Sequence, residues 1–526
     1  MRNAERRPVP RTRALLLAGA VGAVALGGGG CASRRPGTAA PAAHAALNAE
    51  TLRRDLEVFA SDSFAGRRTG TPDAMRAARF LAERLAASGV EPAGDSGYYQ
   101  RVPLARPAYG PGTRFEVRTA AGVEPLTAGE ALLPLPRPTG SDALPATRAE
   151  GDVVFLGAGV PGGGVTQAEL DRMDVGGKVA VVVHGVGAPA PPGEVGRAIE
   201  ALLPRRPAAV VVLLAGESAR LLPQLERQYA RLARSGEPYL APPDSLRTLP
   251  MLLLGDAARA APLLPPGWPA DRRPRALAGR RFAGEIDATF TAYNVVGIVR
   301  GRDPALRATY VAYGAHYDHI GIQRPAEGED AGATAADTIA NGADDDGSGS
   351  VALLAIARAF AGGERPRRSL LFVWHVGEEQ GLLGSEHFAA HPTVPIDSIV
   401  AQLNADMIGR NAPDSLYVVG PRAAPRGQSR VLGEIVDSVN AALPRPFAVN
   451  REWDSPTHPE QIYYRSDHYN YARRGVPVVF FTSGLHADYH RVTDEASKID
   501  YDKLARVGTL LLHVGRAVGE RETRPK

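Results

Sequence analysis

From residue 47 onward, hydrophobic residues recur at helical spacing. Between residues 47 and 85 they stand three or four positions apart, which is typical of amphipathic helices packed on a core. Leu52, Leu56 and Phe59 show this spacing before a turn-rich stretch, and Ala77, Phe80 and Leu81 show it again afterwards. The pattern therefore predicts a helical opening in two pieces.

The pattern changes near residue 120. Up to about residue 285, short apolar runs rich in β-branched residues stand among loops rich in proline and glycine, which predicts a small, separate β-rich domain. The clearest runs are Asp152–Leu156, Lys178–Val183, Ala209–Leu214 and Met251–Leu254.

From Tyr293 onward, strand patterns alternate with helical ones. This alternation predicts an α/β fold with a mostly parallel, mixed sheet flanked by helices on both faces. The predicted strands are Thr309–Tyr313, Leu370–Val376, Ser398–Asn404 and Val476–Thr482, and the predicted helices are Gly349–Phe360, Gly381–Ala389 and Arg430–Ala442. In such sheets, ligands bind beyond the carboxyl ends of the strands, so polar residues placed there are candidates for chemistry.

The net charge of the chain does not indicate a nucleic-acid partner. The chain has 526 residues, 44% of them hydrophobic, and a formal net charge of +4. Residues 1–30 hold five arginines and one glutamate, and removing these from the 61 basic and 57 acidic residues leaves 56 of each. The rest of the chain is neutral, which excludes a polyanion as the expected partner.

The first residues are typical of an export signal. A basic stretch ends at Arg13, and the apolar run Ala14–Leu26 that follows is too short to span a bilayer. Cys31, the only cysteine, stands where a bacterial lipoprotein signal carries its lipidated residue. We expect a lipoprotein-type signal peptide over residues 1–31 and a tether rich in proline and alanine over residues 32–46.

This signal implies an exported protein. Lipidation of Cys31 would attach it to the membrane as a bacterial outer-membrane or periplasmic lipoprotein. The alternative is cleavage by an ordinary signal peptidase and plain secretion.

Candidate metal ligands follow five predicted strands or loops. They are His316 and Asp318 in Gly314–His319, Asp344–Asp346 in Asn341–Gly349, Glu378 and Glu379 in Gly377–Gly381, Asp406 in Asn404–Gly409, and His486, Asp488 and His490 in Gly484–Asp494. Taken together at one edge of a sheet, His, Asp and Glu are the nitrogen and oxygen ligands suited to zinc. Two zinc ions that share one bridging carboxylate need about this many ligands.

The run Asp344–Asp346 leaves a choice open. One of its carboxylates could cap the apolar helix that begins there, because a helix N-terminus favours an acidic side chain. Three caps are redundant, so at least one carboxylate serves another purpose. Spacing alone does not choose among the three.

The residues of these motifs and their order along the chain resemble those of the co-catalytic di-zinc aminopeptidases of metallopeptidase family 28. This family includes aminopeptidase Y and, more distantly, glutamate carboxypeptidase II. The resemblance covers the opening helices and the stretch from about Tyr293 to the C-terminus. It implies a zinc-exopeptidase fold and two zinc ions. By position, His316 and Asp406 would hold one ion, Glu379 and His490 the other, and Asp345 would bridge them.

The same resemblance assigns three catalytic roles. Glu378 would be the general base that takes a proton from the metal-bound water and delivers it to the leaving amine. Asp318 would orient the imidazole of His316, and Tyr489 would stabilise the tetrahedral oxyanion. The motif Arg465–Tyr469 also matches the family near the substrate pocket, without a ligand role. The neighbouring His319, His375 and His486 are expected to be supporting or core residues.

The expected domain layout follows from pattern and resemblance together. Residues 47–119 would form the helical start of the peptidase domain, residues 120–285 an inserted domain that resembles a protease-associated domain, and residues 286–526 the di-zinc catalytic core. The expected function is that of a zinc aminopeptidase, which removes N-terminal residues from peptides. The resemblance implies that Glu378 or Asp406 would hold the free ammonium group of the substrate.

Three other functions stay open at this point. A carboxypeptidase of the glutamate-releasing type, or a dipeptidase, would use the same sheet and metals but needs basic residues to hold a substrate carboxylate. A non-catalytic binding relative would be expected to have lost ligands, whereas all five and the base are present. A single-zinc glutaminyl cyclase is opposed by the intact motif around Asp345.

Overall fold

The computed structural model describes residues 47–525, except 107, 136–142, 158–166, 187–192, 228–237, 324–331 and 422–427. The expected signal peptide and tether, with Cys31, lie outside the described residues. Within the described residues, no helix combines the length and apolar character needed to cross a membrane.

The larger of the two main sheets has the strand order β19-β18-β20-β17-β13-β16-β12-β2-β9, and β1 also pairs with β12. Its four central strands are β17 (Ile399–Ala405), β13 (Tyr310–His316), β16 (Ser369–His375) and β20 (Val478–Thr482). They run parallel to one another and are buried along their whole length, as their continuous apolar sequences require. Their carboxyl ends therefore meet at one edge of the sheet.

The outer strands make the sheet mixed. β12 pairs antiparallel with β16, β2 and β1, β2 with β9, and β18 with β20. These strands are β1 (Glu91–Pro92), β2 (Tyr99–Ala105), β9 (Tyr239–Leu240), β12 (Thr289–Val299), β18 (Ser415–Val419) and β19 (Ala448–Asn450). A separate two-stranded ribbon joins β14 (Gly321–Ile322) to β15 (Ile339–Ala340).

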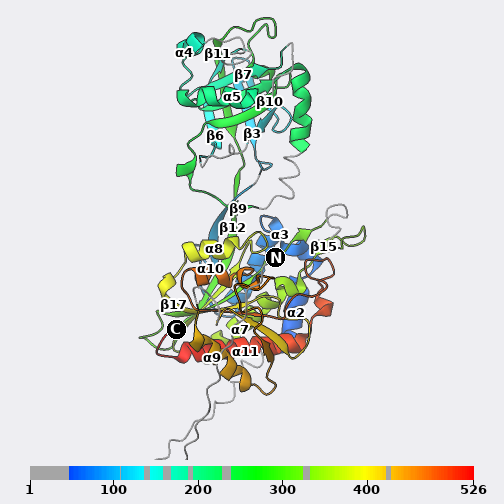
Figure 1. Cartoon of the computed structure of the whole chain (residues 1–526), viewed down its shortest axis with the longest axis vertical. Coiled ribbons are helices and arrows are strands. Elements are labelled where there is room, and N and C mark those ends of the chain that lie inside the picture. The colour runs from blue at the N-terminus through cyan, green and yellow to red at the C-terminus, as the bar shows by residue number, and fades with distance from the viewer. Residues whose placement is uncertain are drawn as a thin grey trace, which may run out of the picture. The chain divides into compact units, whose positions relative to one another are not determined.

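Helices cover both faces of this sheet (Figure 1). One core cluster contains residues of α2 (Ala49–Phe59), α3 (Pro72–Ala87), α7 (Gly349–Ala361), α9 (Arg430–Ala441) and α11 (Tyr501–Glu520). The cluster on the other face contains residues of α8 (Leu383–Ala390) and α10 (His468–Arg473). The predicted fold class is thereby confirmed, and the predicted helices and strands of this part lie within a few residues of their observed bounds.

The second sheet has the order β4-β3-β11-β6-β7-β8-β10-β5. Its middle strands β6, β7, β8 and β10 are parallel, and the remaining strands pair antiparallel. The strands are β3 (Arg114–Thr119), β4 (Gly122–Leu126), β5 (Leu132–Pro134), β6 (Arg148–Phe155), β7 (Val179–His184), β8 (Ala209–Leu214), β10 (Met251–Asp256) and β11 (Arg275–Glu285), with helices α4 (Gln167–Arg172) and α5 (Glu194–Leu202). Its resemblance to a protease-associated domain stays a prediction.

This second sheet begins earlier than the sequence predicts. β3 starts at Arg114, whereas the boundary was placed at residue 120, and Phe115 and Val117 of β3 are buried in its core. Ala120 and Ala121, where the sequence analysis puts the boundary, form the turn that joins the hairpin of β3 and β4. In the other direction, β9 falls within residues 120–285 but pairs with β2 of the larger sheet.

Candidate metal centre

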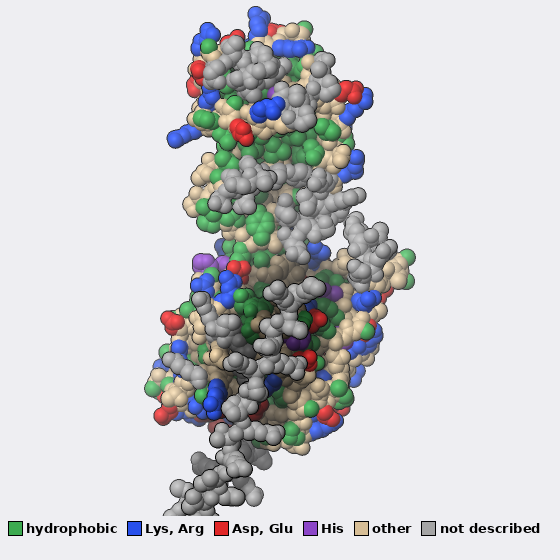
Figure 2. All heavy atoms as spheres, viewed as in Figure 1, with side chains coloured by type: hydrophobic (Ala, Val, Ile, Leu, Met, Phe, Trp, Pro, Cys, Tyr) green, Lys and Arg blue, Asp and Glu red, His purple; other side chains and the backbone are tan. Residues whose placement is uncertain are grey.

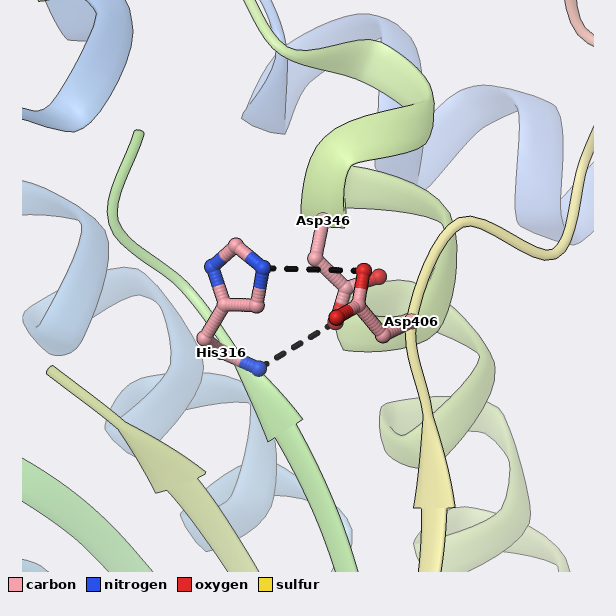
Figure 3. A group of neighbouring side chains, drawn as sticks. All are labelled: His316, Asp346 and Asp406. Atoms are coloured by element: carbon pink, nitrogen blue, oxygen red, sulfur yellow. Dashed lines mark hydrogen bonds and ion pairs between the residues drawn. The ribbon is translucent and has the colours of Figure 1, made fainter. Parts of the chain in front are cut away.

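One half of the candidate centre forms at the ends of two neighbouring strands. His316 is the last residue of β13, and Asp406 follows β17 directly. The Nε2 atom of His316 lies 3.7 Å from Oδ1 of Asp406 and 3.2 Å from Oδ1 of Asp345. Figure 3 shows the imidazole and the Asp406 carboxylate facing each other beyond the strand ends.

The other half lies across Asp345. The Nε2 atom of His490 is 2.9 Å from Oε2 of Glu379 and 3.3 Å from Oδ2 of Asp345. The two oxygens of Asp345 thus face different histidines, His316 through Oδ1 and His490 through Oδ2. The structure therefore brings all five expected ligands together, with the carboxylate of Asp345 in the middle.

The three consecutive aspartates have different partners. Asp346 accepts the backbone N–H groups of His316, Gly349 and Met407 at 3.1, 2.8 and 3.3 Å, so it is both helix cap and loop anchor. Asp344 accepts the N–H of Gly409 at 2.6 Å. Asp345, joined to Asp346 by a cis peptide bond, is the one whose carboxylate lies between the histidines.

The other two carboxylates of this run, those of Asp344 and Asp346, also lie near histidines. Oδ2 of Asp344 lies 3.3 Å from Nε2 of His486. Donor atoms of His316, Asp346 and Asp406 lie within 4.8 Å of one another, as in a metal site. Because both oxygens of Asp346 already accept backbone N–H groups, we assign it the role of support.

His319 lies at the centre and contacts a candidate ligand. It is fully buried, and its Nδ1 lies 2.5 Å from Oε1 of Glu379 and 3.9 Å from Oδ2 of Asp345. His319, Asp345 and Glu379 form a second group whose donor atoms lie within 4.8 Å of one another. Since Oε1 of Glu379 contacts His319 while Oε2 contacts His490, His319 fixes the orientation of a candidate ligand.

Asp318 supports the site in a different way from that expected. Nδ1 of His316 is 3.1 Å from the backbone oxygen of Asp318 and 3.8 Å from its carboxylate, so the main chain fixes the ring and leaves Nε2 facing the centre. The buried carboxylate instead accepts the N–H of Glu378 at 3.2 Å and the hydroxyl of Thr69 at 2.9 Å. Asp318 thereby holds the loop that carries Glu378.

A buried chain of polar groups supports Asp406. Ser466 donates to Oδ2 of Asp406 at 2.7 Å, Asn404 donates to Ser466 at 2.9 Å, and Gln402 donates to Asn404 at 3.0 Å. Ser466 stands in the Arg465–Tyr469 motif, to which sequence reasoning gave no role at the metals. The motif indicated that these residues are functional, but only the fold reveals that Ser466 contacts Asp406.

The electrostatics of the centre attract positive charge. Burial and then the neighbouring carboxylates raise the pKa of Glu378 well above its usual value. Burial would lower the pKa of His490, but contacts with Asp345 and Glu379 raise it to about 10. The pKa of His316 is also raised, because Glu378, Asp406 and Asp345 outweigh the effect of burial. Cations are therefore stabilised where these carboxylates converge.

The centre lines a pocket with an apolar wall. Asp345, Glu378, Glu379, Asp406 and His490 line it together with Met407, Trp453, Ile462, Phe480 and Leu485. Tyr489, also in the lining, stacks on the ring of His490 with centroids 3.9 Å apart. Figure 2 shows a hollow at which acidic, histidine and hydrophobic side chains gather.

Arg67 connects the opening helices to two loops of the centre. It is fully buried, and its guanidinium donates to the backbone oxygens of Tyr317, Asn341 and Gly342 at 2.8, 2.6 and 2.9 Å. It also donates to Phe59 at 3.3 Å. Burial lowers the pKa of Arg67 to about 10. The side chain thus ties the loop after His316 to the loop before Asp345.

Part of the chain is similar to a known protein family. Residues 294–515 match the model of peptidase family M28. The match covers all five candidate ligands and Glu378, and it ends within α11.

Leucine aminopeptidases of fungi are among the curated relatives of this part of the chain. Leucine aminopeptidase 1 of Trichophyton rubrum is 28% identical over 235 residues, which cover 42% of this chain and 57% of the relative. The probable leucine aminopeptidase of Arthroderma benhamiae is 30% identical over 224 residues, or 41% and 55%. The chain thus spans somewhat more than half the length of the curated relatives it matches.

Solved structures were also matched along most of the chain. An aminopeptidase from Aneurinibacillus sp. strain AM-1 aligns with a TM-score of 0.45 and 15% identity, covering 92% of this chain and 96% of that one. A zinc aminopeptidase from Bacillus subtilis aligns with a TM-score of 0.44 and 16% identity, covering 91% and 97%.

Replacing Arg67 with methionine should destabilise the fold strongly. Its loss leaves several buried backbone oxygens without a donor, at a cost of about 1–3 kcal/mol each. We expect the free energy of unfolding to fall by about 3 kcal/mol or more in denaturant titrations followed by circular dichroism. The matched control is Arg68→Met, which removes only one long contact to Ile320. Equal stability of the two variants would contradict this role of Arg67.

Proposed function

We propose that this protein is a zinc-dependent aminopeptidase that removes single residues from the N-terminus of peptides. The observation that carries the proposal is the carboxylate of Asp345, whose two oxygens face His316 on one side and His490 on the other. Such an arrangement suits a carboxylate shared by two cations. The M28 match and the leucine aminopeptidases among the relatives support the reaction class.

The donors present fit two zinc ions. His316 and Asp406 would hold one, His490 and Glu379 the other, and Asp345 both, which gives the mixed nitrogen and oxygen set that zinc favours. Four buried carboxylates, with Glu378 included, would offset the four positive charges of such a pair. When bound, zinc would polarise the substrate carbonyl and make water more acidic.

Glu378 is placed to move the proton. Its Oε2 lies 3.9 Å from Nε2 of His316, its N–H is held by Asp318, and it contacts the open pocket. From this position its carboxylate would take a proton from the attacking water and deliver it to the leaving amine. Tyr489, stacked on His490, is placed to donate its hydroxyl hydrogen to negative charge that develops on the substrate carbonyl oxygen.

The charge of the pocket favours an N-terminal substrate group. Glu378 lines the pocket and is not among the candidate zinc ligands, so its negative charge stays available to attract a free ammonium. The apolar wall formed by Met407, Trp453 and Phe480 suits an apolar first side chain. The second candidate, a dipeptidase or glutamate carboxypeptidase-type enzyme, is favoured by Arg465 in the same lining.

Incubation with a peptide and its N-acetylated twin tests the direction of cleavage. We expect mass spectrometry to show shortening of the free peptide only, from its N-terminus, because the acidic pocket requires an ammonium. A chelator should abolish cleavage and added zinc restore it. Shortening of both peptides from the C-terminus would instead support the carboxypeptidase alternative.

Two substitutions should separate metal binding from turnover. Glu378→Gln is expected to retain zinc but lose turnover by about a hundredfold or more, because only the proton carrier is removed. His490→Ala should lower the zinc content measured by elemental analysis, whereas the exposed His391→Ala should not. Zinc loss in Glu378→Gln, or its full activity, would contradict the role assigned to Glu378.

We also propose that the enzyme is exported and lipid-anchored through Cys31. The basic stretch, the apolar run Ala14–Leu26 and the position of Cys31 support this. In a bacterial host, Cys31→Ser should abolish incorporation of labelled fatty acid and move the protein from the membrane to the soluble fraction. Unchanged membrane association of this variant would argue against the anchor.

A further inference from the structure

Arg465 is the one cationic side chain, other than histidine, among the described residues that line the metal pocket. The remaining polar lining is dominated by carboxylates. A single arginine in the lining of a pocket rich in carboxylates is a candidate contact for an anionic group of the substrate. A role for Arg465 in substrate binding rests on the proposed aminopeptidase function and extends it to the length of the substrate.

The backbone of Arg465 is held close to the candidate ligands. Its N–H donates to Ile462 at 3.0 Å, which closes a turn before α10. The next residue, Ser466, donates to Asp406 at 2.7 Å, and Asp467 contacts Nδ1 of His375 at 3.1 Å. Position 465 is therefore fixed relative to the metal centre on both sides.

The head of the side chain keeps capacity for a ligand. About 40% of the side chain is exposed. One nitrogen donates to the hydroxyl of Tyr489 at 3.4 Å, and another lies 3.8 Å from Oε2 of Glu460. Both contacts are long, and among the described residues they are the polar contacts of this guanidinium. With five N–H donors in a planar fork, it can still bind a carboxylate through two hydrogen bonds.

The distance to a substrate carboxylate follows from peptide geometry. The reacting carbonyl must lie between the centre and Tyr489, and Arg465 contacts the hydroxyl of Tyr489. In a dipeptide, the C-terminal carboxylate is one residue beyond the reacting bond, which is about 3.5 Å of chain. That places it near the guanidinium. Arg465 is the one lysine or arginine among the described lining residues that can offer this carboxylate a positive charge.

We propose that Arg465 binds the C-terminal carboxylate of dipeptides and makes them the preferred substrates of this enzyme. Glu460 competes for the same guanidinium when the pocket is empty. Longer peptides carry their carboxylate beyond this position and gain nothing from Arg465. The side chain acts on substrate binding, so its effect is on KM for substrates with a free C-terminus.

The test compares leucyl-glycine with leucyl-glycinamide, which share the bond to be cleaved and differ in the C-terminal charge. The zinc-loaded wild-type enzyme should show a kcat/KM at least about tenfold higher for the free dipeptide. Arg465→Met should reduce this ratio to about 1, mainly through KM. Glu460→Gln should raise the ratio, because the competing carboxylate is gone. Arg474→Met, a change of an exposed arginine outside the pocket lining, should keep it.

The outcomes separate the two proposals. A wild-type ratio near 1 with cleavage of both substrates would overturn the role of Arg465 while leaving the aminopeptidase intact. An unchanged ratio in Arg465→Met, with both rates reduced equally, would overturn it as well and show that Arg465 acts through Tyr489. No release of leucine from either substrate by the wild-type enzyme would overturn the aminopeptidase function and this inference with it.

Discussion

The structure depends on holding several carboxylates close together away from water. Asp345, Glu378, Glu379 and Asp406 converge at one edge of the sheet, where desolvation and mutual repulsion both oppose their ionised forms. The protein answers with histidines in contact with the carboxylates and with backbone N–H groups directed at Asp346. Each histidine and each N–H group reaches its carboxylate only in a particular loop conformation. The need to stabilise these carboxylates therefore restricts the conformations of the loops around the centre.

The parallel strands make this convergence possible. β13, β16, β17 and β20 end at the same edge, so residues far apart in sequence follow one another around the site. The opening helices then contribute Arg67, which is 274 residues from Asn341 in the sequence and yet donates to its backbone oxygen. An arginine buried this deeply beside acidic groups serves both as a connector and as a source of positive potential. The scaffold and the chemistry of the centre are therefore not independent.

The sequence was sufficient for elements and motifs but not for contacts. Apolar periodicity placed α7 and the central strands within a few residues, because these segments are buried and long. The positions of His316, Glu379 and Asp406 at strand ends followed from the same reasoning. The partners of Ser466, His319 and Arg67 could not be assigned, since they are 60 residues or more away in the chain. In a chain so rich in arginine, nothing local distinguishes a buried Arg67 from one at the surface.

The insertion of the second sheet has a consequence for how the larger sheet assembles. The chain leaves β2 at Ala105 and returns to β12 at Thr289, and these two residues pair directly. Within the insertion, Arg114 of β3 pairs with Glu285 of β11. Once that pairing forms, the two ends of a very long loop are only a few residues from their meeting point. If the second sheet folded first, the entropy cost of closing β2 on β12 would fall by about 2 kcal/mol, and the larger sheet would form faster.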